Sequence, residues 1–372
     1  MAGSSKSKAP RWATVTLIAG ALLMVVSGGG LVTSQALAAR YAGAVQNEDL
    51  FGDAEAGTED LGSDIEGPLN FLLVGIDPRE PTTPPLADSI MVVHVPKDME
   101  SAYVFSIPRD TYVEIPAFEK AGIGTQHGKI NGAMAMGSRV PGKQLPSIVQ
   151  GFELLSRTVS KLTGIERFDA GAIVNFDGFK KVVDALGGVD MYIDERTKSE
   201  HLAPDGSKRP YRPKYKGDEH PYVGPQKVYE VGQAHLEGWE ALDFVRQRYG
   251  LKGTDYARQR HQQQFLKALA DQALSADVVT NPVKLDKVLT AAGKSLTFSG
   301  RGRTVLDFAF ALKSIRPEQI TTIKLSGGSY MPNGRYLGEQ LKPGTEELFA
   351  SIRSDSIDEF LLNNPSFINR AK

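Results

Sequence analysis

Short apolar runs separated by turn-forming residues constrain the fold of this chain most strongly. The run from Asn70 to Ile76 is short and almost wholly apolar, which is typical of a strand that is buried on both faces. Two further runs, Ser89 to Val95 and Ala102 to Ile107, follow closely and are separated by the turn-rich Pro96-Lys97-Asp98. The sequence therefore predicts three strands that lie close together along the chain.

Helical periodicity follows these runs. Apolar residues recur at three- and four-residue steps from Ser147 to Leu162, which is the spacing of an amphipathic helix. Ala172 to Phe176 then predicts a strand, Phe179 to Leu186 a helix that ends at Gly187-Gly188, and Val189 to Ile193 another strand. This alternation predicts a layered α/β fold with helices on both faces of a sheet.

The second half of the chain is less regular. From Glu195 to Gly232 the periodicity disappears and prolines are frequent, which predicts a long excursion that could overhang a site. Ala241 to Arg248 predicts a strand, and Asp255 to about Leu274 predicts a helix with Thr254 as its N-cap. Weaker patterns predict helices at 285–292 and 305–312 and a strand at 320–325.

The N-terminal region has the pattern of an exported protein. Basic residues precede an uncharged, mostly apolar stretch at residues 12–33, which is long enough to cross a hydrocarbon core of about 30 Å. The basic flank predicts a single-pass cell-membrane protein with residues 1–11 in the cytoplasm and the rest outside. A cleavable signal peptide is the alternative, because Ala36-Leu37-Ala38 has the small-x-small form. The acidic residues 40–67 predict a flexible stalk.

Composition and missing motifs exclude several classes of function. The chain has 43 basic and 44 acidic side chains, so no global charge indicates a nucleic-acid partner. It has no cysteine, which excludes a disulfide framework, thiolate metal ligands and a thiol nucleophile. The H-E-x-x-H, P-loop and G-x-S-x-G patterns are also missing, which argues against a zincin, a nucleotide-driven kinase and an α/β-hydrolase.

Arginine and aspartate residues gather at the ends of the predicted strands. Asp77 and Arg79 follow the first strand, Asp88 precedes the second, and Arg109-Asp110 follow the third. Side chains just beyond strand ends are where open α/β sheets place their sites. These residues are therefore candidates for a common site, although isolated pairs of this kind are more often structural ion pairs.

Two more candidate pairs lie further along the chain. Arg246 and Arg248 are two residues apart, so on a strand they would project from one face. Asp255 and Arg258 open the following helix. Guanidinium groups bind phosphate oxygens with paired hydrogen bonds, and carboxylates hold a divalent ion such as Mg²⁺ against the same oxygens. The combination suits pyrophosphate chemistry.

The motifs, taken in order, resemble the LytR-CpsA-Psr family over most of the chain. The strings that carry the resemblance are NFLLVGIDPRE from Asn70, ADSIMVVHV from Ala87, FSIPRDTYVEIP from Phe105, KINGAMAMG from Lys129, FDGFKKVVDALGGVDMYI from Phe176, LEGWEALDFVRQRY from Leu236 and DYARQRHQQQF from Asp255.

This resemblance implies a three-layer α/β/α sandwich with a mixed central sheet. It implies a catalytic domain at 68–355, followed by a C-terminal tail at 356–372, with an apolar cavity for a polyprenyl chain. The implied reaction moves a glycopolymer phosphate from a polyprenyl-pyrophosphate carrier to a peptidoglycan hydroxyl and releases polyprenyl phosphate. Mg²⁺ is the implied cofactor, with Mn²⁺ as an alternative.

The resemblance also implies roles for individual residues. Asp77 and Asp88 match carboxylates that hold the metal. Asp110 and Asp255 match acids that orient the arginines, with general base as the alternative for Asp255. Lys129 and Asn131 lie near the site by motif. The matching pyrophosphate-binding residues are Arg79, Arg109, Arg246, Arg248 and Arg258, and the residues expected to act in catalysis are Arg109, Asp255 and Asp88.

Two positions depart from the family pattern. Leu86 stands where an arginine usually precedes the aspartate matched by Asp88, and His261, with Arg260 beside it, stands where a second helix arginine is usual. Two alternatives to the transferase therefore stay open. One is a hydrolase that uses water as acceptor, and the other is a non-catalytic, membrane-anchored protein that binds lipid or polymer.

Overall fold

The computed structural model describes residues 46–52, 65–78, 80–212, 221–253, 255–273, 287–288, 290–291, 293, 296–312 and 314–369. The predicted cytoplasmic segment, the predicted membrane anchor, Arg79 and the predicted N-cap Thr254 lie outside these ranges. Within them, every helix is too short or too polar to span a bilayer.

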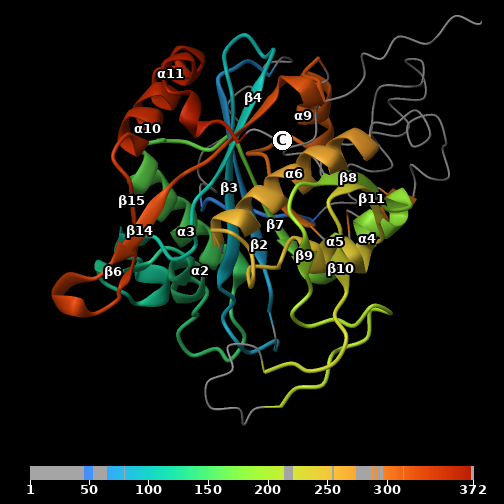
Figure 1. The fold of residues 1–372 in the computed structure, drawn as a ribbon. Helices are drawn as coiled ribbons and strands as arrows, with labels where there is room; N and C mark the ends of the chain where they lie inside the picture. Colours follow the sequence, from blue (N-terminus) through green and yellow to red (C-terminus); the bar gives the residue numbers. More distant parts are fainter. Residues whose placement is uncertain are drawn as a thin grey trace, which may run out of the picture.

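A mixed sheet of seven strands forms the centre of the molecule (Figure 1). β2 pairs antiparallel with β3, β3 with β4, and β7 with β12, whereas β1–β12, β2–β7 and β4–β13 are parallel. The strands, in sheet order, are β1 (Gln46–Asn47), β12 (Leu296–Ser299), β7 (Ala170–Asn175), β2 (Leu69–Ile76), β3 (Ala87–Val95), β4 (Ala102–Ser106) and β13 (Ile320–Ile323).

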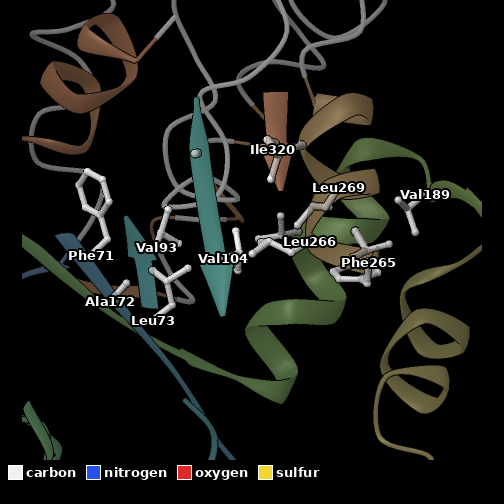
Figure 2. Packing of buried hydrophobic residues seen from close by; sticks show 14 of the residues in the cluster. Phe71, Leu73, Val93, Val104, Ala172, Val189, Phe265, Leu266, Leu269 and Ile320 are labelled. Carbon is white, nitrogen blue, oxygen red and sulfur yellow. The ribbon is translucent and has the colours of Figure 1, made fainter. Parts of the chain in front are cut away.

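Helices pack on both faces of this sheet, as the sequence predicts. Alternate residues of β2 point to opposite faces, so Leu72 joins a core cluster with Phe152 of α3, whereas Leu73 joins a second cluster with Phe265 of α6 (Figure 2). The first face is covered by α2 (Asn131–Gly137), α3 (Ile148–Thr163), α10 (Thr345–Arg353) and α11 (Ile357–Asn363), and the second by α4 (Phe176–Leu186), α5 (Gly238–Phe244), α6 (Asp255–Ala273) and α9 (Val305–Ala311).

Smaller two-stranded sheets flank the central one. They consist of β5 (Tyr112–Ile115) with β6 (Gln126–Lys129), β8 (Val189–Ile193) with β11 (Gly232–Leu236), β9 (Thr197–Lys198) with β10 (Val228–Tyr229), and β14 (Gly327–Tyr330) with β15 (Gly338–Leu341). The predicted strand at 189–193 is thus confirmed, but it belongs to a separate sheet.

The predicted strand from Ala241 to Arg248 is wrong. These residues form most of α5 and the turn after it, because Glu237 and Glu240 make a capping box that starts a helix. The apolar positions Ala241, Leu242 and Phe244 are all buried, and a short buried helix cannot be told from a strand by periodicity alone. Half of the predicted helix at 285–292 lies outside the described residues, and the half that is described, 287–288 and 290–291, is helical.

Part of the predicted acidic stalk is ordered. β1 pairs with β12, and the residues just after it, Leu50 and Phe51, are buried. The Phe51 ring meets Phe152 of α3 edge to face, with 5.5 Å between the ring centroids. The prediction was wrong here because two apolar side chains suffice to anchor this end of an otherwise polar segment. Residues 53–64 lie outside the described ranges.

The predicted C-terminal tail is also part of the fold. Residues 357–363 form α11, whose Ile357 and Leu361 are buried against the sheet face that α3 and α10 cover. Ile368 then makes a β-bridge with Ile323 of β13. The domain therefore extends beyond residue 355, because this amphipathic segment completes the core.

Candidate active site

An apolar cavity of about 140 Å³ lies between the central sheet and helices α4, α5 and α6. Leu73 and Met91 contribute from the sheet, and Phe179 and Leu266 contribute from the helices. Its polar lining is made by Ser89, Arg246 and Gln262. Ser89 Oγ lies 3.0 Å from Gln262 Oε1, so a hydrogen bond joins β3 to α6 at this wall. An apolar chain can therefore lie inside the cavity with a charged group next to Arg246.

Arg246 connects the cavity to the end of β2. Its Nη2 lies 3.1 Å from Oδ2 of Asp77, the residue that follows β2. The Arg246 guanidinium also lies over the ring of Phe176 at 4.3 Å from the centroid, an arrangement that favours a cation. Phe176 begins one of the family motifs quoted above. The spacing of residues in that motif did not indicate that the Phe176 ring would contact Arg246.

Asp88 is placed by an irregularity in β3. Ala87 pairs with Ile76 and Ser89 pairs with Gly75, so Asp88 between them has no partner across the ladder. Bulges of this kind re-aim side chains near active sites. The Asp88 Oδ1 lies 2.6 Å from Arg109 Nη1, so the carboxylate fixes an arginine that follows β4.

The first turn of α6 contributes a third arginine, Arg258, to the site. Arg258 is buried, and its Nη2 lies 2.6 Å from Asp255 Oδ1. Burial lowers the pKa of Arg258, and the carboxylate of Asp255 opposes this shift. Arg109 and Arg248 lie close enough for their positive charges to lower the pKa further, whereas Asp88 raises it. We call Arg109, Arg248 and Arg258 the arginine cluster.

Two hydrogen-bond donors in this cluster are unused. The Nε atoms of Arg109 and Arg258 are buried and have no partner among the described residues. A buried donor without an acceptor destabilises the fold, and guanidinium groups are suited to phosphate oxygens. The cluster thus has the chemistry of an anion-binding site.

Arg246 and Arg248 reach the site from the turn after α5 rather than from a strand. Gln247 between them is buried and donates to Asp243 Oδ1 at 2.7 Å. On either side of Gln247, Arg246 is exposed and Arg248 is half-buried, in a turn and not on the strand face predicted for them. Positive charge from both arginines helps to lower the pKa of His201, after the larger effect of burial, so the excursion lies beside this cluster.

A second group of residues borders the cluster on the side of β15. Lys129 Nζ lies 3.2 Å from Asp110 Oδ2 and 5.0 Å from the centroid of the Tyr336 ring. The backbone nitrogen of Asn131 donates to Arg109 O at 3.1 Å, so the segment around Lys129 fixes the backbone of Arg109. Tyr336 and Glu339 at this border could not be found from the sequence, because they lie in a polar hairpin.

The two departures from the family pattern do not add charge to the cluster. Arg260 is bound by Asp194 at 2.7 Å and Glu195 at 3.0 Å. His261 is fully buried and stacks on Phe244 with 4.4 Å between centroids. Leu86 is 44% exposed beside Ala87. The structure therefore brings together the predicted site residues that it describes. Arg260 and His261 do not join them, so neither replaces the arginine that is missing from the family pattern.

The described residues contain no group of three acidic or histidine side chains that could hold a metal by itself. Asp77 and Asp88 lie at neighbouring strand ends, and each pairs one carboxylate oxygen with an arginine. Mg²⁺ is commonly bound through one or two carboxylates plus substrate phosphates. The donor set fits such a shared site.

The model of the LytR_cpsA_psr family matches residues 36–353. The chain belongs to this family. It is 28% identical to the cell wall biosynthesis protein LcpA of Corynebacterium glutamicum, over 90% of this chain and 64% of that protein. It is 30% identical to the polyisoprenyl-teichoic acid–peptidoglycan teichoic acid transferase TagV of Bacillus subtilis, over 73% of this chain and 60% of that protein. The chain thus spans less than two thirds of these relatives.

Solved structures show the same fold. The crystal structure of B. subtilis TagV aligns with a TM-score of 0.54 at 24% identity and covers 78% of this chain and 98% of that one. A structure of TagT bound to LI-WTA aligns with a TM-score of 0.51 at 25% identity and covers 77% and 90%. The mixed α/β fold expected from the family resemblance is confirmed.

Proposed function

We propose that this protein transfers a glycopolymer phosphate from a polyprenyl-pyrophosphate carrier to a hydroxyl of peptidoglycan. The observation that carries the proposal is the apolar cavity with Arg246 in its wall, next to the cluster of Arg109, Arg248 and Arg258. An amphipathic ligand with an isoprenoid chain and a pyrophosphate matches both parts. The name of the TagV relative supports the same chemistry.

The arginines bind the pyrophosphate in this proposal, and the aspartates orient them. Asp88 holds Arg109 and Asp255 holds Arg258, each at 2.6 Å. One oxygen of Asp255 faces Arg258 and the other accepts from Gln259 at 3.1 Å, so orientation suits Asp255 better than proton abstraction. Arg79 is proposed as a further pyrophosphate ligand on the resemblance alone.

The transfer replaces one phosphorus–oxygen bond with another. The acceptor hydroxyl attacks the phosphorus that carries the glycopolymer, the bond to the bridging oxygen breaks, and polyprenyl phosphate leaves. The hydroxyl proton passes to a carboxylate or to water. The arginines stabilise the charge that gathers on the leaving phosphate.

Asp77 and Asp88 are the proposed ligands of Mg²⁺, with Mn²⁺ as an alternative. Bound there, the ion would neutralise charge on the pyrophosphate oxygens. We also propose that residues 12–33 anchor the protein in the cell membrane, with residues 1–11 in the cytoplasm and the described domain outside.

The test is release of polyprenyl phosphate from a synthetic polyprenyl-pyrophosphate glycan, with oligomeric peptidoglycan as acceptor. Arg109→Ala is compared with Arg196→Ala, which removes an exposed arginine that is paired with Glu230 outside the cluster. Acceptor-dependent release that needs a divalent ion, and that is lost only in Arg109→Ala, supports the proposal. Release that ignores the acceptor indicates a hydrolase, and tight lipid binding without release indicates a non-catalytic protein.

A further inference from the structure

A second pocket, of about 430 Å³, lies beside the beginning of α6, between the segment that follows β13 and the C-terminal residues. Lys252, Lys324, Lys342 and Arg260 line it, and no acidic residue does. The three lysines are exposed. This group, which we call the lysine pocket, is separate from the arginine cluster and takes no part in the mechanism proposed above.

The positive charge of the lysine pocket is not neutralised within the described residues. Arg260 is paired with Asp194 and Glu195. In contrast, none of the three lysine ammonium groups has a carboxylate within 4.0 Å among the residues that the structure describes. Like charges that share a pocket repel each other, so the pocket favours an anion.

Backbone hydrogen bonds hold each lysine at the pocket. The nitrogen of Lys252 donates to Glu195 Oε1 at 2.9 Å, and that of Lys342 donates to Ser326 O at 2.8 Å. The nitrogen of Lys324 donates to Phe367 O at 2.7 Å, so the C-terminal segment completes one wall. The lysines therefore converge because of the fold, while their long side chains stay adaptable.

The pocket adjoins the arginine cluster through the first turns of α6. Tyr256 lines the pocket, whereas the preceding Asp255 holds Arg258 of the cluster. At a rise of 1.5 Å per residue, Asp255 and Arg260 lie roughly 7.5 Å apart along the helix axis. The pocket and the arginine cluster therefore lie close to each other along α6, at a spacing that a short polymer segment is long enough to bridge.

We propose that the lysine pocket binds an anionic group, a phosphodiester or a carboxylate, of the glycopolymer that is being transferred. This inference rests on the proposed function for the identity of the polymer. Arginine binds phosphate in a fixed fork, whereas the lysine ammonium is a compact charge on a flexible stem. The reacting pyrophosphate needs the fixed geometry of arginine. A repeating polymer segment needs only a flexible contact that accepts its charge in several positions.

The test uses the full chain in detergent and measures equilibrium binding of a fluorescent oligo(glycerol phosphate), with a neutral dextran oligomer as comparison. Lys324→Gln/Lys342→Gln is compared with Lys97→Gln/Lys143→Gln, which removes two exposed lysines that do not line the pocket. Exposed ion pairs contribute about 0.2–1 kcal/mol each, so the pocket variant should weaken binding of the anionic probe about 2- to 30-fold. Lys324→Arg/Lys342→Arg should retain it.

The binding experiment is repeated in an Arg109→Ala background, which removes an anion-binding donor of the arginine cluster. Binding that persists, and that remains sensitive to the two pocket lysines, supports the proposal whether or not the protein transfers polymer. The proposal is overturned if the Arg109→Ala background no longer binds the probe, or if both double variants bind it equally. If the wild-type protein does not release lipid phosphate, that result counts against the proposed function and not against the lysine pocket.

Discussion

Filling the apolar cavity should separate lipid binding from pyrophosphate binding. Val182 lies on α4, is 7% exposed and lines the cavity with Phe179 and Leu266. The arginine cluster lies on elements other than α4. The phenylalanine side chain of Val182→Phe should therefore fill the cavity without displacing the arginines. We expect this variant to bind a polyprenyl pyrophosphate poorly and inorganic pyrophosphate normally.

The size of the effect follows from the volume of the cavity. A dry apolar cavity of roughly 150 Å³ can hold a ligand of the size of benzene, so about 140 Å³ accommodates about one five-carbon isoprene unit. Burial of each carbon group is worth about 0.8 kcal/mol, which gives an upper bound of about 4 kcal/mol. Blocking the cavity should therefore weaken lipid affinity by between ten-fold and about a thousand-fold.

The assay is calorimetric titration of farnesyl pyrophosphate and of inorganic pyrophosphate into wild type, Val182→Phe and Val231→Phe. Val231 is 54% exposed, so it carries the same substitution outside the cavity. Overpacking costs about 1–3 kcal/mol of stability, and a thermal unfolding curve of each variant checks that the fold is retained. Equal farnesyl pyrophosphate affinity in a folded Val182→Phe protein would refute the assignment of this cavity to the lipid.

Three further predictions concern charged residues. Arg109→Lys should lower the rate of lipid phosphate release by about 10²–10³-fold, because one ammonium group cannot replace a fork of donors at the leaving phosphate; single-turnover kinetics measure this. Asp255→Asn should cost about 3 kcal/mol in urea unfolding by leaving Arg258 buried without its partner, and the double variant Asp255→Asn/Arg258→Met should recover much of the loss. Burial lowers the pKa of His94 from 6.5, although nearby carboxylates oppose the shift. Because the unfolded chain then binds the proton first, stability should fall as pH drops below about 6.5, and His94→Gln should flatten that slope in urea titrations.

Elements whose residues pack locally were predictable. β2, β3 and β4 follow one another and are buried on both faces, so a continuous apolar run identifies each of them. The amphipathic period of α3 is likewise a local signal. The start of α4 was missed by three residues, because Asn175, whose side chain accepts from Gly178 N at 2.8 Å, caps the helix just before Phe176. The positions of Asp77, Asp88 and Arg109 at the ends of β2, β3 and β4 could therefore be predicted from the sequence, whereas their roles remain predictions that rest on the family resemblance.

Elements that depend on distant partners were not predictable. β1 exists because it pairs with β12, about 250 residues further along the chain. The excursion after β8 has no apolar period, and buried Arg209 organises it by donating to the carbonyl oxygens of Glu200 at 2.6 Å and Tyr222 at 2.9 Å. A pattern of hydrophobicity does not reveal an arginine that acts as a structural centre.

The pairing of charges also depends on residues that are distant in the sequence. This pairing decides which arginine and lysine side chains are available to bind a ligand. In the sequence, Arg258 and Arg260 are equivalent residues on one helix. In the structure, Arg260 faces two carboxylates, whereas the Nε of Arg258 has no partner among the described residues. No sequence pattern identifies Lys324 or Lys342 as functional. The fold nevertheless brings them together in a pocket that no acidic residue lines. The anion-binding capacity of this protein therefore depends on where its carboxylates fold, which a count of 43 basic and 44 acidic side chains cannot indicate.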